Sequence, residues 1–289
     1  MTPTPTALAT ELLGKTCLVT GGSSGIGKAA ALSLAQRGAH VVLACRDERR
    51  GARARTEIAA ATGNAHVELM LADFSLQTSI RDFASRVLER FRALDVLINN
   101  AGTWSEKRQE TAEGIEHVWA TNVLGYALTT SLLMELLVRS RARIVNVAST
   151  LARDLDLDDV EFRRRSYSGV KAYAQSKQAN RMWTWGLARR LDGTGATANA
   201  MHPGGVSTGL FRKGGGALSL VVAVWAKLFA KNASAGADTA VWLATDPKLE
   251  NVSGKFWIDR KQAACRFRGV ESEERLWSLC ERMTGVSAR

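Results

Sequence analysis

The fold of this chain is decided by the stretch Thr16-Cys17-Leu18-Val19-Thr20-Gly21-Gly22-Ser23-Ser24-Gly25-Ile26-Gly27. Its first five residues are a short apolar run that stops abruptly at the glycines, and the run from Lys28 to Arg37 then carries Ala and Leu at helical spacing. This pattern predicts a strand, a glycine-rich turn and a helix. In such a turn, backbone N–H groups and a helix N-terminus can face a phosphate group.

The residues around the turn favour a dinucleotide as its ligand. A second apolar run, His40 to Ala44, follows the predicted helix at the spacing expected for a second strand. Gly27-Lys28 is followed by Ala29, whereas the phosphate loop of nucleoside triphosphatases needs Ser or Thr there. We therefore favour a dinucleotide over ATP.

Strands and helices alternate along the rest of the chain. Further strands are predicted at His66–Leu71, Asp95–Ile98, Arg143–Val147, Thr197–Met201 and Lys255–Ile258. Helices are predicted at Arg46–Thr62, Leu76–Arg92, Ile115–Arg139 and Ser176–Leu191. The alternation predicts an α/β fold, a Rossmann-type doubly wound parallel sheet of about seven strands with helices on both faces. We expect a flexible N-terminal tail at residues 1–13 and a single dinucleotide-binding catalytic domain at residues 14–289.

Composition sets further bounds on the class of protein. The 289 residues are 46% hydrophobic and 23% charged, as in ordinary globular proteins. No apolar run reaches the ~18 residues that span a bilayer, and the N-terminus does not resemble a signal peptide. The four cysteines show neither CxxC spacing nor a metal-ligand pattern with the four histidines. These features favour a cytoplasmic protein with buried thiols and no metal site.

The net charge of +11 invites a nucleic-acid interpretation. However, the basic residues are spread over several segments, most with acidic residues close by. We therefore expect no nucleic-acid partner, and attribute the charge to an anionic small molecule or to solubility.

The stretch Tyr173-Ala174-Gln175-Ser176-Lys177 carries proton chemistry. On a helix that begins after Ser168-Gly169, residues four apart share a face, so Tyr173 and Lys177 would point the same way. A phenol titrates near ~10, and bringing it to ~7 takes about 4 kcal/mol of preferential stabilisation of the phenolate. A fixed ammonium supplies stabilisation of that sign. Taken alone, the pair also fits an exposed helix face.

Polar or glycine-rich motifs follow several predicted strands. They are Asp73, Asn99-Asn100-Ala101-Gly102, Ser149, and His202-Pro203-Gly204-Gly205. In doubly wound sheets, ligands bind at the carboxyl ends of the strands where the strand order reverses. The motifs therefore predict one site at that edge.

With these ordered motifs the chain resembles the classical short-chain dehydrogenases/reductases, and within them the retinol-dehydrogenase-like branch. The resemblance spans roughly Lys15 to Gly285; pairs such as Ala179-Asn180 and Leu276-Trp277 resemble that branch in particular. It implies a catalytic set: Tyr173 as acid/base, Lys177 as its electrostatic partner, Ser149 as the hydroxyl that binds the substrate oxygen, and Asn122 as part of a water-linked proton path. The structural alternatives are a strand-end cap for Ser149 and a buried amide for Asn122.

The glycine-rich turn and the resemblance together assign the cofactor contacts. These are Gly21, Ser23, Ser24, Gly25, Ile26, Gly27, Lys28, Arg46, Asp73, Phe74, Asn100, Ala101, Gly102, Tyr173, Lys177, Pro203, Gly204, Val206 and Thr208.

The end of the second predicted strand favours NADP(H) over NAD(H). NAD sites usually carry an acidic residue there, and this chain has Cys45 followed by Arg46. A planar guanidinium suits a 2′-phosphate, and Lys28 could add to it. Asp47 lies about where a ribose-binding acid is expected, but we place it at a helix N-terminus, where a carboxylate is locally favoured.

Two stretches bear on the substrate. Residues 206–232 contain the glycines Gly214 to Gly216 ahead of an apolar run, and in the family this segment covers the substrate. It implies a small lipophilic substrate, a retinoid-, steroid- or aliphatic/aromatic ketone-like carbonyl or alcohol. Lys213, Lys227 and Lys231 leave peripheral membrane contact open. Residues 151–166 are interpreted as a solvated loop in preference to a gate.

Three functions are therefore compared. The leading hypothesis is an NADP(H)-dependent oxidoreductase, which the family would make a homo-oligomer. A non-catalytic dinucleotide-binding regulatory protein usually lacks the Tyr or Lys, and both are present. A sugar-nucleotide epimerase or dehydratase is disfavoured by the spacing of Gly21, Gly25 and Gly27 and by the short region after the sixth strand.

Overall fold

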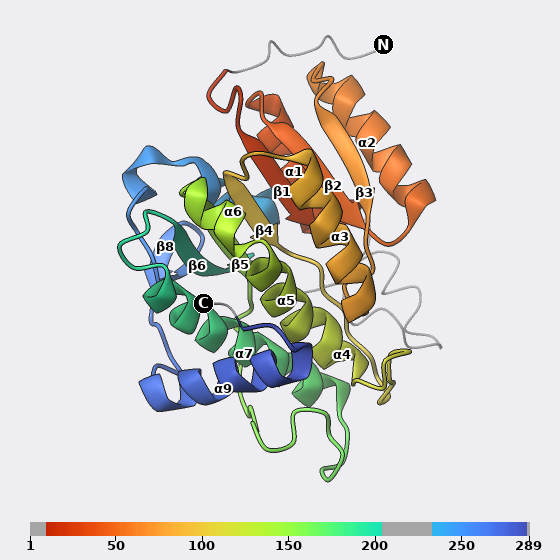
Figure 1. The fold of residues 1–289 in the computed structure, drawn as a ribbon, viewed down its shortest axis with the longest axis vertical. Helices are drawn as coiled ribbons and strands as arrows, with labels where there is room; N and C mark the ends of the chain where they lie inside the picture. Colours follow the sequence, from red (N-terminus) through yellow and green to blue (C-terminus); the bar gives the residue numbers. More distant parts are fainter. Residues whose placement is uncertain (1–9, 204–232, 288–289) are drawn as a thin grey trace.

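A single twisted sheet forms the centre of the computed structural model, which describes residues 10–203 and 233–287 (Figure 1). The strand order is β3-β2-β1-β4-β5-β6-β7-β8. The first seven strands in chain order pair in parallel, and β8 pairs antiparallel with β7. The strands are β1 (Thr16–Thr20), β2 (His40–Cys45), β3 (Val67–Leu71), β4 (Val96–Asn99), β5 (Arg143–Val147), β6 (Thr197–His202), β7 (Phe256–Ile258) and β8 (Lys261–Ala263).

The predicted doubly wound parallel sheet is therefore confirmed, with one strand added. β8 follows β7 through a two-residue turn in which Asp259 and Arg260 both have positive φ, 49° and 58°. Such turns are recognised in sequences by Asn-Gly or Asp-Gly, and Asp-Arg does not give that signal. The eighth strand was missed for this reason.

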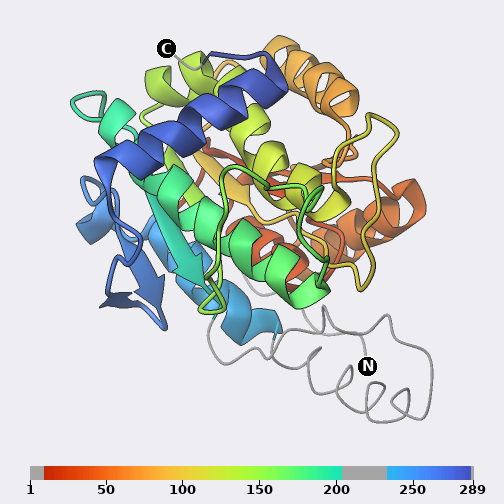
Figure 2. The same ribbon diagram turned by 90° about the horizontal axis from the view of Figure 1, so that it is seen from below.

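Helices cover both faces of the sheet. One face packs against α1 (Gly25–Gln36), α2 (Glu48–Thr62) and the helical residues 233–245. The other packs against α3 (Gln77–Arg90), α5 (Gly125–Leu132), α6 (Met134–Arg139) and α7 (Gly169–Arg190). In Figure 2, α9 (Val270–Thr284) lies alongside α7 on its outer side. A short 3₁₀ turn, η3 (Pro247–Leu249), precedes β7.

The alternation of side chains along the strands accounts for these two layers. In β1, Cys17 and Val19 pack into the core below α1, whereas Leu18 packs into the core below α3 and α5. All five residues of β1 are buried. A parallel strand covered on both faces reads as a continuous apolar run, and this is the signal that the first strand carries.

The prediction of one helix over Ile115–Arg139 is wrong. The segment is divided into α4 (His117–Trp119), a π-helical turn η1 (Ala120–Leu124), α5 and α6. A Cβ on Gly125 would lie 2.8 Å from the Phe74 carbonyl oxygen, so the chain passes very close to the end of β3 at this point. A π-helical turn is rare and marks functional sites more often than chance. Here it contains Asn122.

α7 begins at Gly169, within the Ser168-Gly169 pair after which the helix was predicted to begin. Both Tyr173 and Lys177 therefore lie on it, as expected. Ser168 is the extended N-cap residue, and a Cβ on Gly169 would lie 2.2 Å from the Ser105 carbonyl oxygen. Glycine is needed at this position because the backbone after β4 passes against it.

Part of the predicted tail is anchored. Leu12 is buried, and its N–H donates to the Arg37 carbonyl oxygen at 2.8 Å. Residues 10–13 therefore form a turn packed at the end of α1, and the rest of the predicted tail lies outside the described residues. Within residues 10–203 and 233–287, no helix is both long and apolar enough to cross a membrane.

Candidate active site

The turns after β1 and β4 are tied together by Thr20. Its Oγ1 accepts the N–H groups of Asn100 and Ala101, both at 2.9 Å, and Asn100 Nδ2 donates to the Thr20 carbonyl oxygen at 2.9 Å. A Cβ on Gly27 would lie 2.5 Å from both Asn100 Nδ2 and the Gly21 carbonyl oxygen. The glycine-rich turn is therefore held against the Asn-Asn-Ala-Gly turn at the point where the strand order reverses.

The first turn of α1 fits a phosphate group. Ser24 is its N-cap residue and forms no side-chain capping hydrogen bond. Gly25 has φ of +54°, and no described atom lies within 4 Å of a Cβ position there. N–H groups of an uncapped first turn beside open space can bind an anion. Gly21, Ser23, Ser24, Ile26 and Gly27 belong to the same turn and first helical turn, and their contact with a cofactor stays a prediction.

The end of β2 carries Arg46, which faces Asp73 beyond β3. Arg46 Nη1 lies 3.3 Å from Asp73 Oδ2, and the Arg46 side chain is 66% exposed. Burial raises the pKa of Asp73, but hydrogen bonds from Ser75 and the charge of Arg46 outweigh it and hold the pKa below its ordinary value. Asp73 is therefore a carboxylate at neutral pH.

Three further predictions concern Asp47, Lys28 and Phe74. Asp47 is the N-cap residue of α2, where it accepts the Arg50 N–H at 3.0 Å, so its predicted place at a helix N-terminus is confirmed. Lys28 forms an ion pair with Glu57 on α2. The Phe74 side chain packs edge-on against Phe83 in the core, and its contact with the cofactor stays a prediction.

Ser149, Tyr173, Lys177 and Asn122 gather at the carboxyl end of β5, each at most 4% exposed. The Ser149 hydroxyl donates a hydrogen bond to the Tyr173 phenol. Lys177 Nζ donates to the Val147 carbonyl oxygen at 2.8 Å and lies 5.8 Å from the centre of the Tyr173 ring. A Cβ on Gly102, after β4, would lie 4.0 Å from this Nζ. The four residues therefore lie beside the Asn-Asn-Ala-Gly turn that follows β4.

Asn122 joins the turn after β4 to α7. Its Oδ1 accepts the Thr103 N–H at 2.8 Å, and its Nδ2 donates to the Thr103 carbonyl oxygen and to Ser176 Oγ, each at 3.0 Å. Ser176 Oγ in turn donates to the Tyr173 carbonyl oxygen at 2.7 Å. The amide therefore supports the turn and the helix that carry Gly102 and Tyr173.

Burial dominates the proton affinities of Tyr173 and Lys177. It raises the pKa of Tyr173 to about 12, against the opposing effect of the Ser149 hydrogen bond. It lowers the pKa of Lys177 to about 7. Desolvation therefore destabilises the charged forms of both groups in this structure. The Tyr173 phenol is therefore protonated at neutral pH.

Sequence reasoning missed one residue near this set. Arg181, one turn beyond Lys177 on α7, donates from Nη2 to the Ser149 carbonyl oxygen at 2.6 Å. The sequence did indicate this position, because Tyr173, Lys177 and Arg181 follow one another at intervals of four residues, which places them along one side of a helix.

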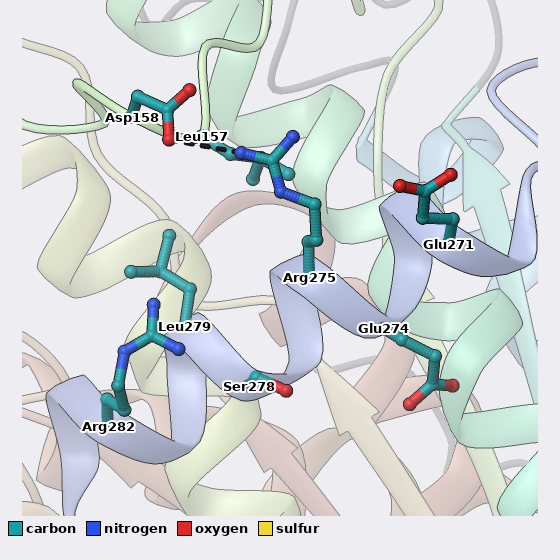
Figure 3. A pocket seen from close by; sticks show the side chains of 8 residues that line it. All are labelled: Leu157, Asp158, Glu271, Glu274, Arg275, Ser278, Leu279 and Arg282. Carbon is teal, nitrogen blue, oxygen red and sulfur yellow. Dashed lines mark hydrogen bonds and ion pairs between the residues drawn. The ribbon is translucent and has the colours of Figure 1, made fainter.

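The region from Leu151 to Ser166 is more firmly held than a solvated loop. Asp159 accepts the N–H groups of Arg163, Arg164 and Arg165. Gln175 Nε2, on α7, donates to the Val160 carbonyl oxygen at 2.7 Å. Figure 3 shows Arg275 reaching from α9 to Asp158, 3.0 Å away, across a groove of about 460 Å³. None of the predicted site residues lines that groove.

The remaining predictions concern the end of β6 and metals. Pro203 follows β6 and is buried, whereas Gly204, Val206, Thr208 and the covering segment at 206–232 lie outside the described residues. Among the residues that the structure describes, no group of three or more His, Cys, Asp and Glu side chains could hold a metal ion.

The doubly wound sheet, the glycine-rich turn and the buried Ser-Tyr-Lys set define the class of protein, an oxidoreductase that transfers hydride to or from a nicotinamide dinucleotide. The family model described as short chain dehydrogenase matches residues 15–215. The chain belongs to the short-chain dehydrogenase family, in its retinol-dehydrogenase-like branch.

Similar proteins support both levels of this assignment. Human retinol dehydrogenase 13 is 38% identical over 286 residues, covering 95% of this chain and 86% of that protein. Human retinol dehydrogenase 12 is 40% identical over 283 residues, covering 96% and 88%. An uncharacterized protein of known structure from Mycobacterium paratuberculosis superposes with a TM-score of 0.78 at 29% identity, covering 99% and 100% of the two chains.

Proposed function

We propose that this protein is an NADP(H)-dependent oxidoreductase that transfers hydride between the cofactor and a hydrophobic carbonyl or alcohol, with Tyr173 as the acid/base. The observation that carries the proposal is the hydrogen bond between Ser149 and Tyr173 at the carboxyl end of β5, with Lys177 beside it. This edge of the sheet also carries the glycine-rich turn after β1.

Each of the chain's own residues has a role in this proposal. The bound cofactor supplies the hydride. The Ser149 hydroxyl orients the substrate oxygen toward Tyr173, whose Oη gives up a proton in reduction. Because the pKa of Tyr173 is about 12, the phenol is protonated at neutral pH and can donate its proton to a carbonyl oxygen. The Lys177 ammonium, when protonated, stabilises negative charge that develops on Oη as the proton leaves.

The proposed preference for NADP(H) rests on Arg46. Its guanidinium is mostly exposed and anchored by Asp73 on one side, so its other N–H groups remain available for a phosphate group. Asp47 is engaged in capping α2. Lys28 is paired with Glu57, so Arg46 is the main candidate for recognition of a 2′-phosphate.

Arg46→Ala tests the cofactor preference. A charge-assisted hydrogen bond contributes about 1.5–3 kcal/mol, so KM for NADPH should rise roughly 10- to 100-fold while KM for NADH changes little. Arg53→Ala is the matched control, since Arg53 is an exposed arginine of α2 that pairs with Glu57. An equal rise for both cofactors, or tighter NADH binding by the unmodified protein, would contradict the preference.

The proposed substrate class rests on the names of the relatives and on the apolar sequence of residues 206–232. A screen of retinoids, steroids, aliphatic aldehydes and quinones should find turnover with hydrophobic members. The screen is followed by loss of the reduced-cofactor absorbance.

Tyr173→Phe tests the proton donor. General acid catalysis contributes about 10²–10⁴-fold, so kcat should fall by that factor while cofactor binding is nearly unchanged. Tyr167→Phe is the control, because the Tyr167 hydroxyl bonds Ser105 and Glu116 instead. Retained turnover in Tyr173→Phe would refute the mechanism. Cofactor binding without turnover in the unmodified protein would favour the regulatory alternative.

A further inference from the structure

Arg181 is a buried cation that the proposed reaction does not yet use. It is 4% exposed and lies on α7, about two turns beyond Tyr173. Within residues 10–203 and 233–287, no carboxylate forms an ion pair with it. A buried charge without an opposite partner costs free energy. An ion pair therefore does not account for an arginine at this position.

The environment of the guanidinium is largely apolar. It lies 3.6 Å from the centre of the Phe256 ring, and Phe267 is 5.9 Å away. Its Nε has no hydrogen-bond partner in the described structure. Burial lowers the pKa of Arg181 to about 10, and repulsion from Arg266 adds to this, yet the group stays cationic at neutral pH. Its strong polar contact is the one to the Ser149 carbonyl oxygen, at 2.6 Å.

Ser149 needs such a contact because the sheet ends before it. The pairing of β5 with β6 ends at Val147 and Met201, and the Ala148 N–H still donates to the Met201 carbonyl oxygen at 2.8 Å. The Ser149 carbonyl lies beyond the ladder, where a buried oxygen has to find another donor. Lys177 Nζ bonds the Val147 carbonyl oxygen, and Arg181 bonds that of Ser149. Two cations one turn apart on α7 thus hold alternate carbonyls of one chain segment.

We propose that Arg181 is a positioning residue that fixes the Ser149 backbone so that the Ser149 hydroxyl faces the Tyr173 phenol. This role rests on the proposed function, in which that hydroxyl orients the substrate oxygen. Ser149 Oγ also accepts the Leu151 N–H at 3.1 Å. The carbonyl contact from α7 and this turn together define where the hydroxyl lies.

Arg181→Met separates positioning from folding. Methionine keeps an unbranched apolar stem beside Phe256 and removes both the charge and the donor. We expect a folded protein with unchanged cofactor affinity and a fall in kcat of about 10- to 100-fold, the size of effect that small misplacements produce. Arg181→Lys keeps a cationic donor and should recover part of the lost kcat. Full activity in Arg181→Met would overturn the proposal.

A double-mutant cycle with Ser149→Ala tests the route of the effect. If Arg181 acts through Ser149, adding Arg181→Met to Ser149→Ala should cause little further loss of kcat. If instead the double variant loses kcat by the product of the two single-variant factors, Arg181 acts independently of Ser149. That result would overturn the proposal.

Crystal structures provide a readout that does not depend on turnover. In the unmodified protein and in Arg181→Lys, Ser149 Oγ should lie within hydrogen-bond distance of Tyr173 Oη, and in Arg181→Met this contact should be lost or lengthened. An unchanged contact in Arg181→Met would overturn the positioning role. If the unmodified protein turns over no substrate, the proposed function fails, and the same crystallographic comparison still decides whether Arg181 positions Ser149.

Discussion

Lys177 illustrates how burial at a single residue connects stability to proton transfer. The side chain is 4% exposed, and burial lowers its pKa from 10.5 to about 7. Its ammonium donates to the Val147 carbonyl oxygen and lies beside two aromatic rings, those of Tyr126 and Tyr173. No described carboxylate forms an ion pair with it, so the charged form is stabilised mainly by dipoles and ring faces. Such a lysine gains or loses its proton easily near neutral pH.

The pH dependence of stability follows from that lowered pKa. Between pH 7 and 10.5 the unfolded chain holds more protons on Lys177 than the folded chain does, so the free energy of unfolding rises with pH in this interval. At lower pH the cost of the buried charge is present in full. Lys177→Met removes the titration, so its stability relative to the unmodified protein should fall as pH rises from 7 toward 9, by at most about 1.4 kcal/mol per pH unit.

Urea unfolding at a series of pH values measures this difference. The exposed Lys171, on the same helix, gives the control Lys171→Met, which removes a lysine that is not buried. If the difference in stability between Lys177→Met and the unmodified protein does not change with pH, Lys177 does not lose its proton in this range.

At the scale of elements, the site depends on how closely α1 approaches the turn after β4. Gly27 is a helical glycine, and replacing a helical glycine by alanine ordinarily stabilises a protein by about 0.5–1 kcal/mol. At Gly27 the added Cβ would lie 2.5 Å from the Gly21 carbonyl oxygen and from Asn100 Nδ2. The Gly21 carbonyl oxygen is a backbone atom and cannot move aside as the end of a flexible side chain can. Replacing Gly27 by alanine should therefore destabilise the protein.

Gly27→Ala should therefore lower the melting temperature and weaken NADPH binding together. Gly186→Ala on α7 is the matched control, because its nearest neighbour, Trp277, would be at an ordinary contact distance of 3.4 Å. That variant should be as stable as the unmodified protein or more so. Calorimetry and fluorescence titration measure the two properties, and equal behaviour of the two variants would contradict the close approach of α1.

The same scale shows what a pattern of residues can and cannot predict. The ranges Thr16–Thr20 and Arg143–Val147 were predicted with the bounds observed, since apolar runs between turn residues carry that information. The π-helical turn at Ala120–Leu124 was not predictable from the pattern of residues; beside it Gly125 approaches Phe74, a contact between distant segments. Arg181 was missed because an arginine on a helix ordinarily lies at the surface.

For the molecule as a whole, the order of the motifs predicted one edge of the sheet as the site, and the structure brings Gly102, Ser149, Tyr173 and Lys177 together there. Sequence pattern could not predict how α9 completes the core. Its Glu273 and Glu274 pair with Arg189 and Arg190 at the end of α7. Charged residues at helical spacing are equally compatible with a solvent-exposed face. The sequence pattern alone therefore does not show that these residues form ion pairs with α7.

The packing of α9 makes a prediction about global stability. Trp277 is 3% exposed and stacks on Trp183 of α7, with ring centres 5.3 Å apart, while Arg190 lies 3.8 Å from its ring centre. The far end of α9 is held by α3, since Gln77 Nε2 donates to the Met283 carbonyl oxygen at 2.8 Å. Removal of a large buried aromatic side chain costs about 3–5 kcal/mol, and Trp277→Ala should lose stability of this size in one cooperative transition.

Val270→Ala is the control on the same helix, because Val270 is 63% exposed and should change stability by less than about 0.5 kcal/mol. Urea unfolding, monitored by tryptophan fluorescence and by circular dichroism, shows whether α9 unfolds together with the sheet or in a separate transition. Coincident transitions would mean that α9 unfolds with the sheet, so the helix belongs to the same cooperative unit as the catalytic helix α7. A separate early transition in Trp277→Ala, or a loss no larger than that of Val270→Ala, would mean that α7 keeps its place without α9.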